Sequence, residues 1–361
     1  MKYNVEKMIA ELCPTGVLYC EMGKLAQIGT GKSNGNEAEN NGEYPFFIRS
    51  PIVKRKNCYE YDEEAIIIPG EGGVGDVFHY INGKYALHQR VYRIHFTTKD
   101  VDTRFMYYYL SANFKVFIQR KAVNATVTSI RKPMIEQFPI PLPPLPIQQE
   151  IVRILDTFTN LTAELTAELT ARRKQYEYYR DELLTFGEDV SRVQLGLVCD
   201  FKYGKGNNIP NETGEYPVYG CNGIVSTTNT FNSEDAPIIG HIGSAGVVNW
   251  GKGKHFVTYN GTICRVKADK IRSRYAYYVL NSLHLERFVK GSQPFLSYGD
   301  FSKVLIPLPP IERQDEIVRI LDQFDYFCND LTSGIPAEIS ARQKQYEYYR
   351  NQLLTFKRIG G

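Results

Sequence analysis

One sixteen-residue stretch occurs twice in this chain with hardly a change. ARRKQYEYYRDELLTF, from Ala171 to Phe186, returns as ARQKQYEYYRNQLLTF, from Ala341 to Phe356. A second shared block, IPLPP followed by QxEIVRILD, precedes each copy, at Ile140 to Asp156 and at Ile306 to Asp322. The sequence between the copies differs, so a constant frame carries two variable inserts. We expect such a chain to present two related but different surfaces.

The repeated blocks have the apolar spacing of long helices. In the first block this seam steps by four and three, as in a coiled coil, through Ile147, Ile151, Ile154, Phe158, Leu161 and Leu165. The tandem duplication TAELTAEL (Thr162–Leu169) adds four residues, which makes a stutter. A proline run before the seam predicts an extended lead-in: Pro141, Pro143, Pro144 and Pro146. If the two repeat helices pack on each other they run antiparallel, and docking of each on a separate protein is also open.

The inserts are diverged copies of one another. GEYPFF (Gly42–Phe47) matches GEYPVY (Gly214–Tyr219), and TRFMYYYL (Thr103–Leu110) matches SRYAYYVL (Ser273–Leu280). The stretch 68–80 similarly parallels 238–250. Each insert orders short β-type runs, then a helix, then a last strand into IPLPP. The sequence therefore predicts an α/β (α+β) fold, with two pseudo-twofold-related globular domains of mixed sheets separated by two long antiparallel coiled-coil helices.

Four segments follow from these boundaries. We expect a first domain with a short N-terminal helix over residues 1–146, and a long spacer helix over residues 147–186. A second domain over residues 187–310 and a second spacer helix over residues 311–356 follow, the latter broken near Gly334–Pro336. Residues 1–146 and 187–310 are called the first and second insert below.

The charge is distributed unevenly between frame and inserts. The chain has 361 residues and a net charge of +3, yet its two helical segments hold ten basic and fifteen acidic residues. The remainder carries +8, which points mildly toward an acidic partner such as nucleic acid. No apolar run approaches the roughly 20 residues of a membrane span, and the N-terminus lacks the core of a signal peptide. The seven scattered cysteines predict reduced thiols and a cytoplasmic protein.

Motifs for chemistry are weak. Ala26–Ser33 fits a permissive phosphate loop, but turn-forming residues follow where a helix would have to start. Gly70–Gly75 fits GxGxxG, and the sequence after it predicts a hairpin. The six histidines show no metal spacing, and no nucleophile elbow is present. We therefore expect no catalytic residues, no metal site and no cofactor in this chain.

The Pro-rich junction, QxEIVRILD, the TAEL tandem, the repeated KQYEYYR helix and the two-half organisation resemble the specificity subunit of type I restriction-modification enzymes. The resemblance covers essentially the whole chain and is specific in the repeats. It implies that each insert is a target recognition domain reading half of a split, non-palindromic site in double-stranded DNA. It implies that the helices dock two modification subunits, which bind S-adenosylmethionine and methylate adenine. It further implies restriction subunits that use ATP and Mg.

Candidate contact residues are polar or basic residues of loops, where phosphates and base edges are usually met. For DNA we predict Lys32, Ser33, Asn34, Arg49, Arg55, His88, Arg90, Lys205, Asn207, Asn208, His241, Ser244, Lys252 and Lys254. For subunit docking we predict Tyr176, Tyr179, Arg180, Tyr346, Tyr349 and Arg350. Two alternatives stay open: a non-catalytic two-headed protein-binding scaffold without DNA recognition, and nucleotide chemistry through the Ala26–Ser33 loop.

Overall fold

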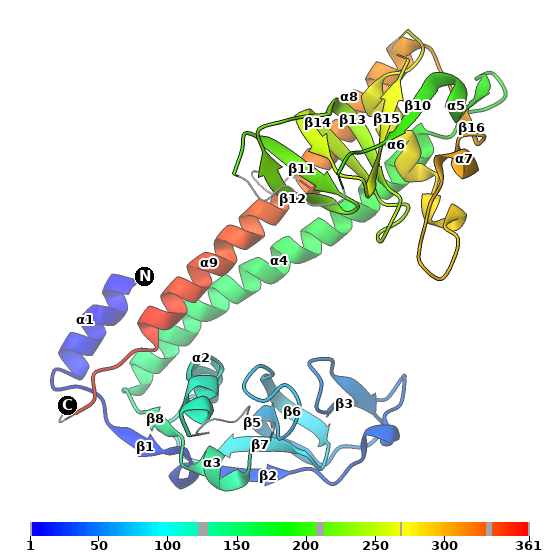
Figure 1. The fold of residues 1–361 in the computed structure, drawn as a ribbon. Coiled ribbons are helices and arrows are strands. Elements are labelled where there is room, and N and C mark those ends of the chain that lie inside the picture. Colours follow the sequence, from blue (N-terminus) through cyan, green and yellow to red (C-terminus); the bar gives the residue numbers. More distant parts are fainter. Residues whose placement is uncertain (1, 122–128, 207–212, 268, 330–333, 360–361) are drawn as a thin grey trace. The chain divides into compact units, whose positions relative to one another are not determined.

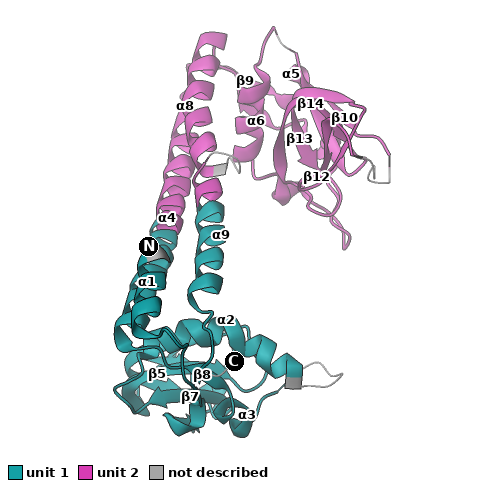
Figure 2. Ribbon diagram, turned by 90° about the vertical axis from the view of Figure 1, so that its left-hand side faces the viewer, with its two compact units in different colours: residues 1–164, 339–361 teal, residues 165–338 magenta. Residues whose placement is uncertain are grey.

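The computed structural model describes every residue except 1, 122–128, 207–212, 268, 330–333 and 360–361. The chain forms two compact units, one of residues 1–164 with 339–361 and one of residues 165–338 (Figure 2). Each unit holds one insert together with helical segments from both repeats (Figure 1). Among the described residues, no helix combines the length and apolar character that a membrane crossing requires.

The first unit contains a six-stranded sheet in the order β2-β7-β5-β6-β3-β4. Neighbouring strands are antiparallel except β3 and β6, which run parallel. The strands are β2 (Ala26–Thr30), β3 (Tyr44–Phe47), β4 (Lys54–Lys56), β5 (Tyr61–Pro69), β6 (His79–Leu87) and β7 (Val91–Phe96), with β1 (Tyr19–Glu21) and β8 (Pro139–Pro141) as a separate antiparallel pair. The helices are α1 (Lys2–Leu12), α2 (Thr103–Lys121) and α3 (Lys132–Glu136), with short 3-10 turns η1 (Met22–Lys24) and η2 (Gly35–Glu37).

The second unit repeats this sheet strand for strand, in the order β10-β15-β13-β14-β11-β12. Its parallel pair is β11 with β14. The strands are β10 (Cys199–Tyr203), β11 (Tyr216–Gly220), β12 (Gly223–Thr228), β13 (Ser233–Gly240), β14 (Val248–Val257) and β15 (Gly261–Val266), with β9 (Arg192–Gln194) paired to β16 (Leu305–Pro307). The helices are α5 (Leu195–Val198), α6 (Ser273–Ser282), η3 (Leu285–Phe288) and α7 (Tyr298–Phe301). The two mixed sheets confirm the predicted fold class.

The apolar run Ala65–Ile68 in strand β5 is explained by the burial of both faces of the strand. Successive strand residues point to opposite faces. Ile66 and Ile68 therefore join the core that also contains α2, whereas Ala65 and Ile67 join a smaller core on the other face. Both faces are buried, so the usual alternation of apolar and polar residues is absent. β13 behaves in the same way, with Ile238 and Ile239 in different cores.

The first repeat forms α4 (Leu145–Leu183), one helix of 39 residues. Its start differs from the prediction, because Pro146 lies inside its first turn and not in the extended lead-in. Proline is tolerated there, since first-turn N–H groups have no partner within the helix. The second repeat forms α8 (Ile311–Asn329) and α9 (Ile335–Leu353), and Pro336 occupies the first turn of α9.

In each unit, the beginning of one repeat helix packs antiparallel on the end of the other repeat. In the first unit Phe158 of α4 stacks on Tyr349 of α9, with ring centroids 5.3 Å apart. In the second unit Phe324 of α8 stacks on Tyr179 of α4 at 5.4 Å. Phe158 and Phe324 hold the same place in the two repeats, as do Tyr349 and Tyr179. Each helix pair is therefore built from both copies of the repeat.

Segments from both ends of the described chain meet in the first unit. The Val17 N–H donates to the Lys357 carbonyl at 2.7 Å, and the Ile359 N–H donates to the Val17 carbonyl at 3.1 Å. In the second unit, a continuous segment leads from α4 to β9. In the first unit, the connection between helix and insert is thus made by two separate segments held together by hydrogen bonds, whereas in the second unit one continuous segment makes it.

Candidate functional site

A buried glutamine fixes each insert to its helix. Gln148 is fully buried near the start of α4, where its Oε1 accepts the Asp102 N–H at 2.8 Å. Its Nε2 donates to the carbonyls of Asp100 and Pro143 at 2.8 and 2.7 Å. Gln314 makes the same three bonds in the second unit, to Arg272 N–H and to the Lys270 and Pro309 carbonyls. This shared glutamine explains part of why QxEIVRILD is constant.

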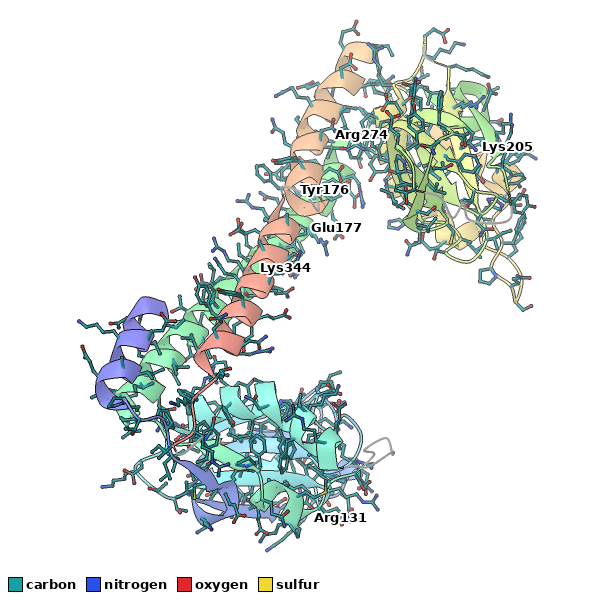
Figure 3. All side chains as sticks on the ribbon, turned by 60° about the vertical axis from the view of Figure 1, so that its left-hand side comes forward. Arg131, Tyr176, Glu177, Lys205, Arg274 and Lys344 are labelled. Atoms are coloured by element: carbon teal, nitrogen blue, oxygen red, sulfur yellow. The ribbon has the colours of Figure 1, made fainter. Side chains whose placement is uncertain are left out.

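A second joint pairs an insert arginine with a helix aspartate. Arg104 of α2 donates to Asp156 at 3.1 Å. Arg274 of α6 donates to Asp322 at 2.6 Å, and its guanidinium lies 4.9 Å from the centre of the Trp250 ring. Figure 3 shows Arg274 on the helix-facing side of the second insert and Lys205 on the opposite side. These joints hold each insert's loops at a defined place relative to its helix segments.

Four loop residues of the first insert converge around one open cavity of about 320 Å³. They are Arg49, Glu71, His88 and Arg90, which we call the first loop cluster. Glu71 Oε2 accepts from Arg90 at 2.8 Å and from Arg49 at 3.2 Å, and the cavity is lined by Arg49, Glu71 and His88. The Arg90 hydrogen bond, with Arg49 nearby, lowers the pKa of Glu71. Burial and the two guanidinium charges lower the pKa of His88, so the cluster carries about one net positive charge near neutral pH.

Two other predicted residues lie beside this cluster, but Ser33 faces inward. Ser33 is 4% exposed, and its hydroxyl donates to Glu60 at 2.5 Å while accepting from Lys56 at 2.7 Å. A hydrogen bond to Glu37 raises the pKa of the nearly buried Lys56. Ser33 is committed to this internal network and not available for a ligand. Asn34 is exposed and accepts from Gln89 at 2.8 Å.

The last two predicted residues of the first insert differ from each other. Lys32 is exposed on the same loop as Ser33. Arg55 lies on β4, where its guanidinium donates to the carbonyls of Gly42 and Glu43 at 2.9 and 2.7 Å. These bonds tie the β3–β4 hairpin together, so Arg55 has a structural task that the sequence did not reveal.

The second insert has the same loop framework with different side chains. The Gly70 N–H donates to the Arg90 carbonyl at 2.9 Å, and in the second insert the His241 N–H donates to the Asn260 carbonyl at 3.1 Å. The bonds from Val91 to His88 and from Gly261 to Thr258, both 3.0 Å, also correspond. The His88 and Thr258 N–H groups also donate to the Phe47 and Tyr219 carbonyls, both at 3.0 Å, which matches Arg49 with Cys221 two residues further on. The second loop cluster is therefore Cys221, Ile242, Thr258 and Asn260, where the first insert has Arg49, Glu71, His88 and Arg90. One framework thus presents a charged set in one insert and an uncharged set in the other.

His241 is a buried residue and not a surface contact. It is 1% exposed, its Nδ1 lies 3.1 Å from the Thr262 hydroxyl, and the Tyr203 ring packs 4.4 Å away. Burial lowers its pKa to about 4. Its Nε2 has no hydrogen-bond partner in the described part of the chain. The sequence signal, a histidine in a Gly-rich loop, does not tell an inward side chain from an outward one.

The other predicted residues of the second insert are more accessible. Lys205, Lys252 and Lys254 are exposed, and Lys254 lies 4.8 Å from the centre of the Phe231 ring. Ser244 is half-buried, and its carbonyl accepts from the Val247 N–H. Unlike the buried His241, these residues are therefore accessible to a ligand at the surface. Asn207 and Asn208 lie outside the described residues.

The predicted docking residues lie mostly within the helix pairs. Tyr179 and Tyr349 stack on phenylalanines of the other repeat, and burial raises the pKa of Tyr346 and Tyr176. Arg180 and Arg350 lie over the Tyr176 and Tyr346 rings at 5.8 and 5.7 Å. Tyr178 and Tyr348 reach furthest into solvent, at 64% and 56% exposed, and Tyr179 is still 37% exposed despite its stacking. These two tyrosines, Tyr178 and Tyr348, belong to the same QYEYYR stretches, whose helical spacing turns them away from the seam, so they are docking candidates as well.

The structure provides no support for nucleotide binding at the two Gly-rich motifs, Ala26–Ser33 and Gly70–Gly75. Ala26–Ser33 forms strand β2 and a loop, followed by the three-residue turn η2, so no long helix N-terminus faces a phosphate. Gly70–Gly75 lies in the connection between β5 and β6, which pair as a hairpin. Among the described residues, no three His, Cys, Asp or Glu side chains gather as metal ligands. All seven cysteines are free thiols.

Comparison with known families decides between the remaining interpretations. The family model of the type I restriction modification DNA specificity domain matches residues 17–172 and again residues 187–341. The chain belongs to this family. It is thus a specificity subunit, the non-catalytic component that gives a type I restriction-modification system its DNA sequence recognition. The protein-binding scaffold is not favoured.

Curated and solved specificity subunits are similar over most of their length. A putative type I restriction enzyme specificity subunit of Haemophilus influenzae is 31% identical over 347 residues, covering 87% of this chain and 89% of its own. A type I restriction enzyme specificity subunit of Escherichia coli is 32% identical over 289 residues, covering 70% of each chain. The solved type I S subunit from M. genitalium shares the fold, with a TM-score of 0.66 at 19% identity over 94% of this chain and 95% of its own.

Proposed function

We propose that this specificity subunit reads a bipartite, non-palindromic site in duplex DNA, one half-site with each insert. The observation that carries the proposal is the repeated loop framework with unlike side chains. A symmetric protein reads a palindrome because its two reading surfaces are identical. Here the frames match while the loop clusters differ in charge, so the two half-sites differ in sequence.

The partners we propose are two modification subunits, held by the helices formed from the repeats. Each helix pair contains the end of one repeat and the beginning of the other, so the chain offers two equivalent docking surfaces. Tyr178 and Tyr348 are the exposed aromatic residues at equivalent places on them. S-adenosylmethionine belongs to the modification subunits, and ATP with Mg to restriction subunits where these are present.

Binding to DNA is tested by its salt dependence. The purified chain with its modification subunits is expected to shift a duplex carrying the host's methylated site, and the affinity is expected to fall steeply with salt as phosphate-bound counterions are released. Methylome sequencing of the host with and without the gene supplies the site. A complex that binds no duplex at low salt contradicts the proposal and revives the protein-binding scaffold.

The distance between half-sites is proposed to depend on α4. Thr162–Leu169 lies within this continuous helix, and one four-residue TAEL unit contributes roughly 6 Å at 1.5 Å per residue. One base pair occupies about 3.4 Å. Deleting one TAEL unit is expected to shorten the preferred spacer while leaving both half-site sequences unchanged. Methylation mapping in the deletion strain measures this, and altered half-site bases with an unaltered spacer would contradict it.

A further inference from the structure

Resting on the proposed function, we infer that Arg49 and Arg90 read guanine in the half-site bound by the first insert, with Glu71 as a positioning residue. The inference concerns which residues give the first insert its preference and which base pair they recognise. It is argued from the geometry of the first loop cluster and from its contrast with the second.

The two guanidiniums are exposed but oriented. The side chains of Arg49 and Arg90 are 46% and 56% exposed, whereas the Glu71 carboxylate between them is 34% exposed. Each arginine uses one Nη1 group on the same oxygen, Glu71 Oε2. A guanidinium has five N–H donors, so several remain for a ligand. Because the shared carboxylate already restricts the rotamers of both arginines, each arginine loses less conformational entropy when it binds a ligand.

The loops that carry this cluster are themselves fixed. The Arg90 N–H donates to His88 Nδ1 at 3.0 Å. Gly70 makes two backbone hydrogen bonds: its N–H donates to the Arg90 carbonyl, and its carbonyl accepts from the Ile130 N–H. Glu71 also forms an isolated antiparallel bridge with Ser129. The arginine side chains therefore extend from a framework that does not have to form when DNA arrives.

The chemistry of the cluster matches guanine. Guanine presents two acceptors, N7 and O6, in the major groove, and arginine forms a bidentate pair with them, the commonest specific contact in that groove. Adenine presents an N6 amino donor beside its N7, and a guanidinium has no acceptor with which to receive that hydrogen bond. The uncharged His88 in the cavity adds no repulsion to either base. The cluster thus favours a G·C pair over the other pairs.

The second loop cluster argues against a general phosphate-binding role. Phosphate contacts carry no sequence information, so both inserts would be expected to keep cations at equivalent places. The equivalents of Arg49 and Arg90 are Cys221 and Asn260, and the equivalent of Glu71 is Ile242. The framework bonds are kept while both cations are lost. Such a pattern is expected of positions that specify a sequence.

The test is a set of charge-conserving variants, Arg49→Lys and Arg90→Lys, in the complex of the full chain with its modification subunits. Lysine keeps the charge but loses the bidentate fork. Binding is measured by selection from a duplex library that is randomised in both half-sites, at one salt concentration, together with the salt slope on the preferred duplex. Arg153→Lys on α4, an exposed arginine paired with Glu150, is the matched control.

At least one variant is expected to lose about five- to hundred-fold in discrimination at one G·C pair of the first half-site. The second half-site serves as an internal control for folding and assembly, and its preference and the salt slope are expected to stay unchanged. Glu71→Gln is expected to weaken the same base preference, and Glu71→Asp to restore part of it.

Three results would overturn the inference. A uniform loss over all sequences with a shallower salt slope would make the arginines phosphate contacts. An unchanged preference in both variants would place the cluster away from the DNA. A preference lost at a pair other than G·C would assign a different base. If the unaltered complex selects no sequence at all, it is the proposed function that fails, and this result is separate from the other three.

Discussion

The buried glutamine at each insert–helix joint gives a prediction whose size follows from the hydrogen bonds. Replacing Gln314 with Leu keeps approximately the volume but removes three bonds, of 2.9, 3.1 and 2.9 Å. Gln314 is fully buried, so all three groups lose this partner, the Pro309 carbonyl in a buried site and the Arg272 N–H and Lys270 carbonyl in partly buried ones. An unsatisfied buried group costs about 1–3 kcal/mol. We expect the second unit to lose about 3–5 kcal/mol of unfolding free energy.

The protein contains a convenient reporter for this measurement. Its single tryptophan, Trp250, lies in the second unit beside Arg274. Urea unfolding followed by tryptophan fluorescence therefore reports the unit that holds Gln314. Gln148→Leu removes the equivalent bonds in the first unit, and hydrogen exchange resolved by segment is expected to show a loss of protection there of similar size.

The prediction can be refuted in two ways. A loss below about 1 kcal/mol for Gln314→Leu would mean that the three backbone groups find other partners at little cost. A second test uses Gln314→Glu, which keeps the acceptor but cannot donate to two carbonyls when ionised. Greater stability for Glu than for Leu at neutral pH would show that the donor bonds are not what matters.

Two further predictions concern individual residues of the inserts. His241 has a pKa of about 4 in the folded protein, below its unfolded value. The unfolded state therefore binds the proton first, and the stability of the protein falls as the pH drops below about 6.5. Between pH 7 and pH 5 we expect a loss of about 2 kcal/mol that His241→Asn abolishes, and an equal pH dependence in both proteins would contradict this. At Gly31 a Cβ would lie 1.7 Å from the Leu87 carbonyl oxygen, so Gly31→Ala is expected to destabilise the first unit by about 3 kcal/mol or more. Gly72 has open space around its Cβ but a φ of +64°, so Gly72→Ala is expected to cost about 1–2 kcal/mol. Hydrogen exchange of the first unit compares the two variants, and equal effects would contradict the steric argument.

The frame of the molecule could be predicted because its signals are local or repeated. Apolar spacing indicates the helices, and short apolar runs between turn residues indicate the strands. The antiparallel pairing of the repeats followed from their order along the chain, and the stacking of Phe158 on Tyr349 agrees with it. The start of α4 was placed too late because proline excludes a helix interior but not a first turn.

The loop residues could not be assigned in the same way, because their orientation depends on partners far away in the sequence. Ser33 turns inward toward Lys56 and Glu60, which lie 23 and 27 residues further along. Glu71 was missed, although an acidic residue in a Gly-rich loop between two arginine-bearing loops was a usable signal. The two inserts also align misleadingly, since sequence matches Gly70 with Gly240 whereas the backbone bonds match it with His241.

The reciprocal packing of the repeats has a consequence for how such a chain can change. A substitution at Tyr349 must suit Phe158, which belongs to the other repeat, and a substitution at Tyr179 must suit Phe324. Each repeat therefore constrains the sequence of the other, and neither can diverge alone. The same reciprocity makes a half-chain with one insert and one repeat self-complementary. Two copies of it could supply each other's missing helix and would read a palindrome.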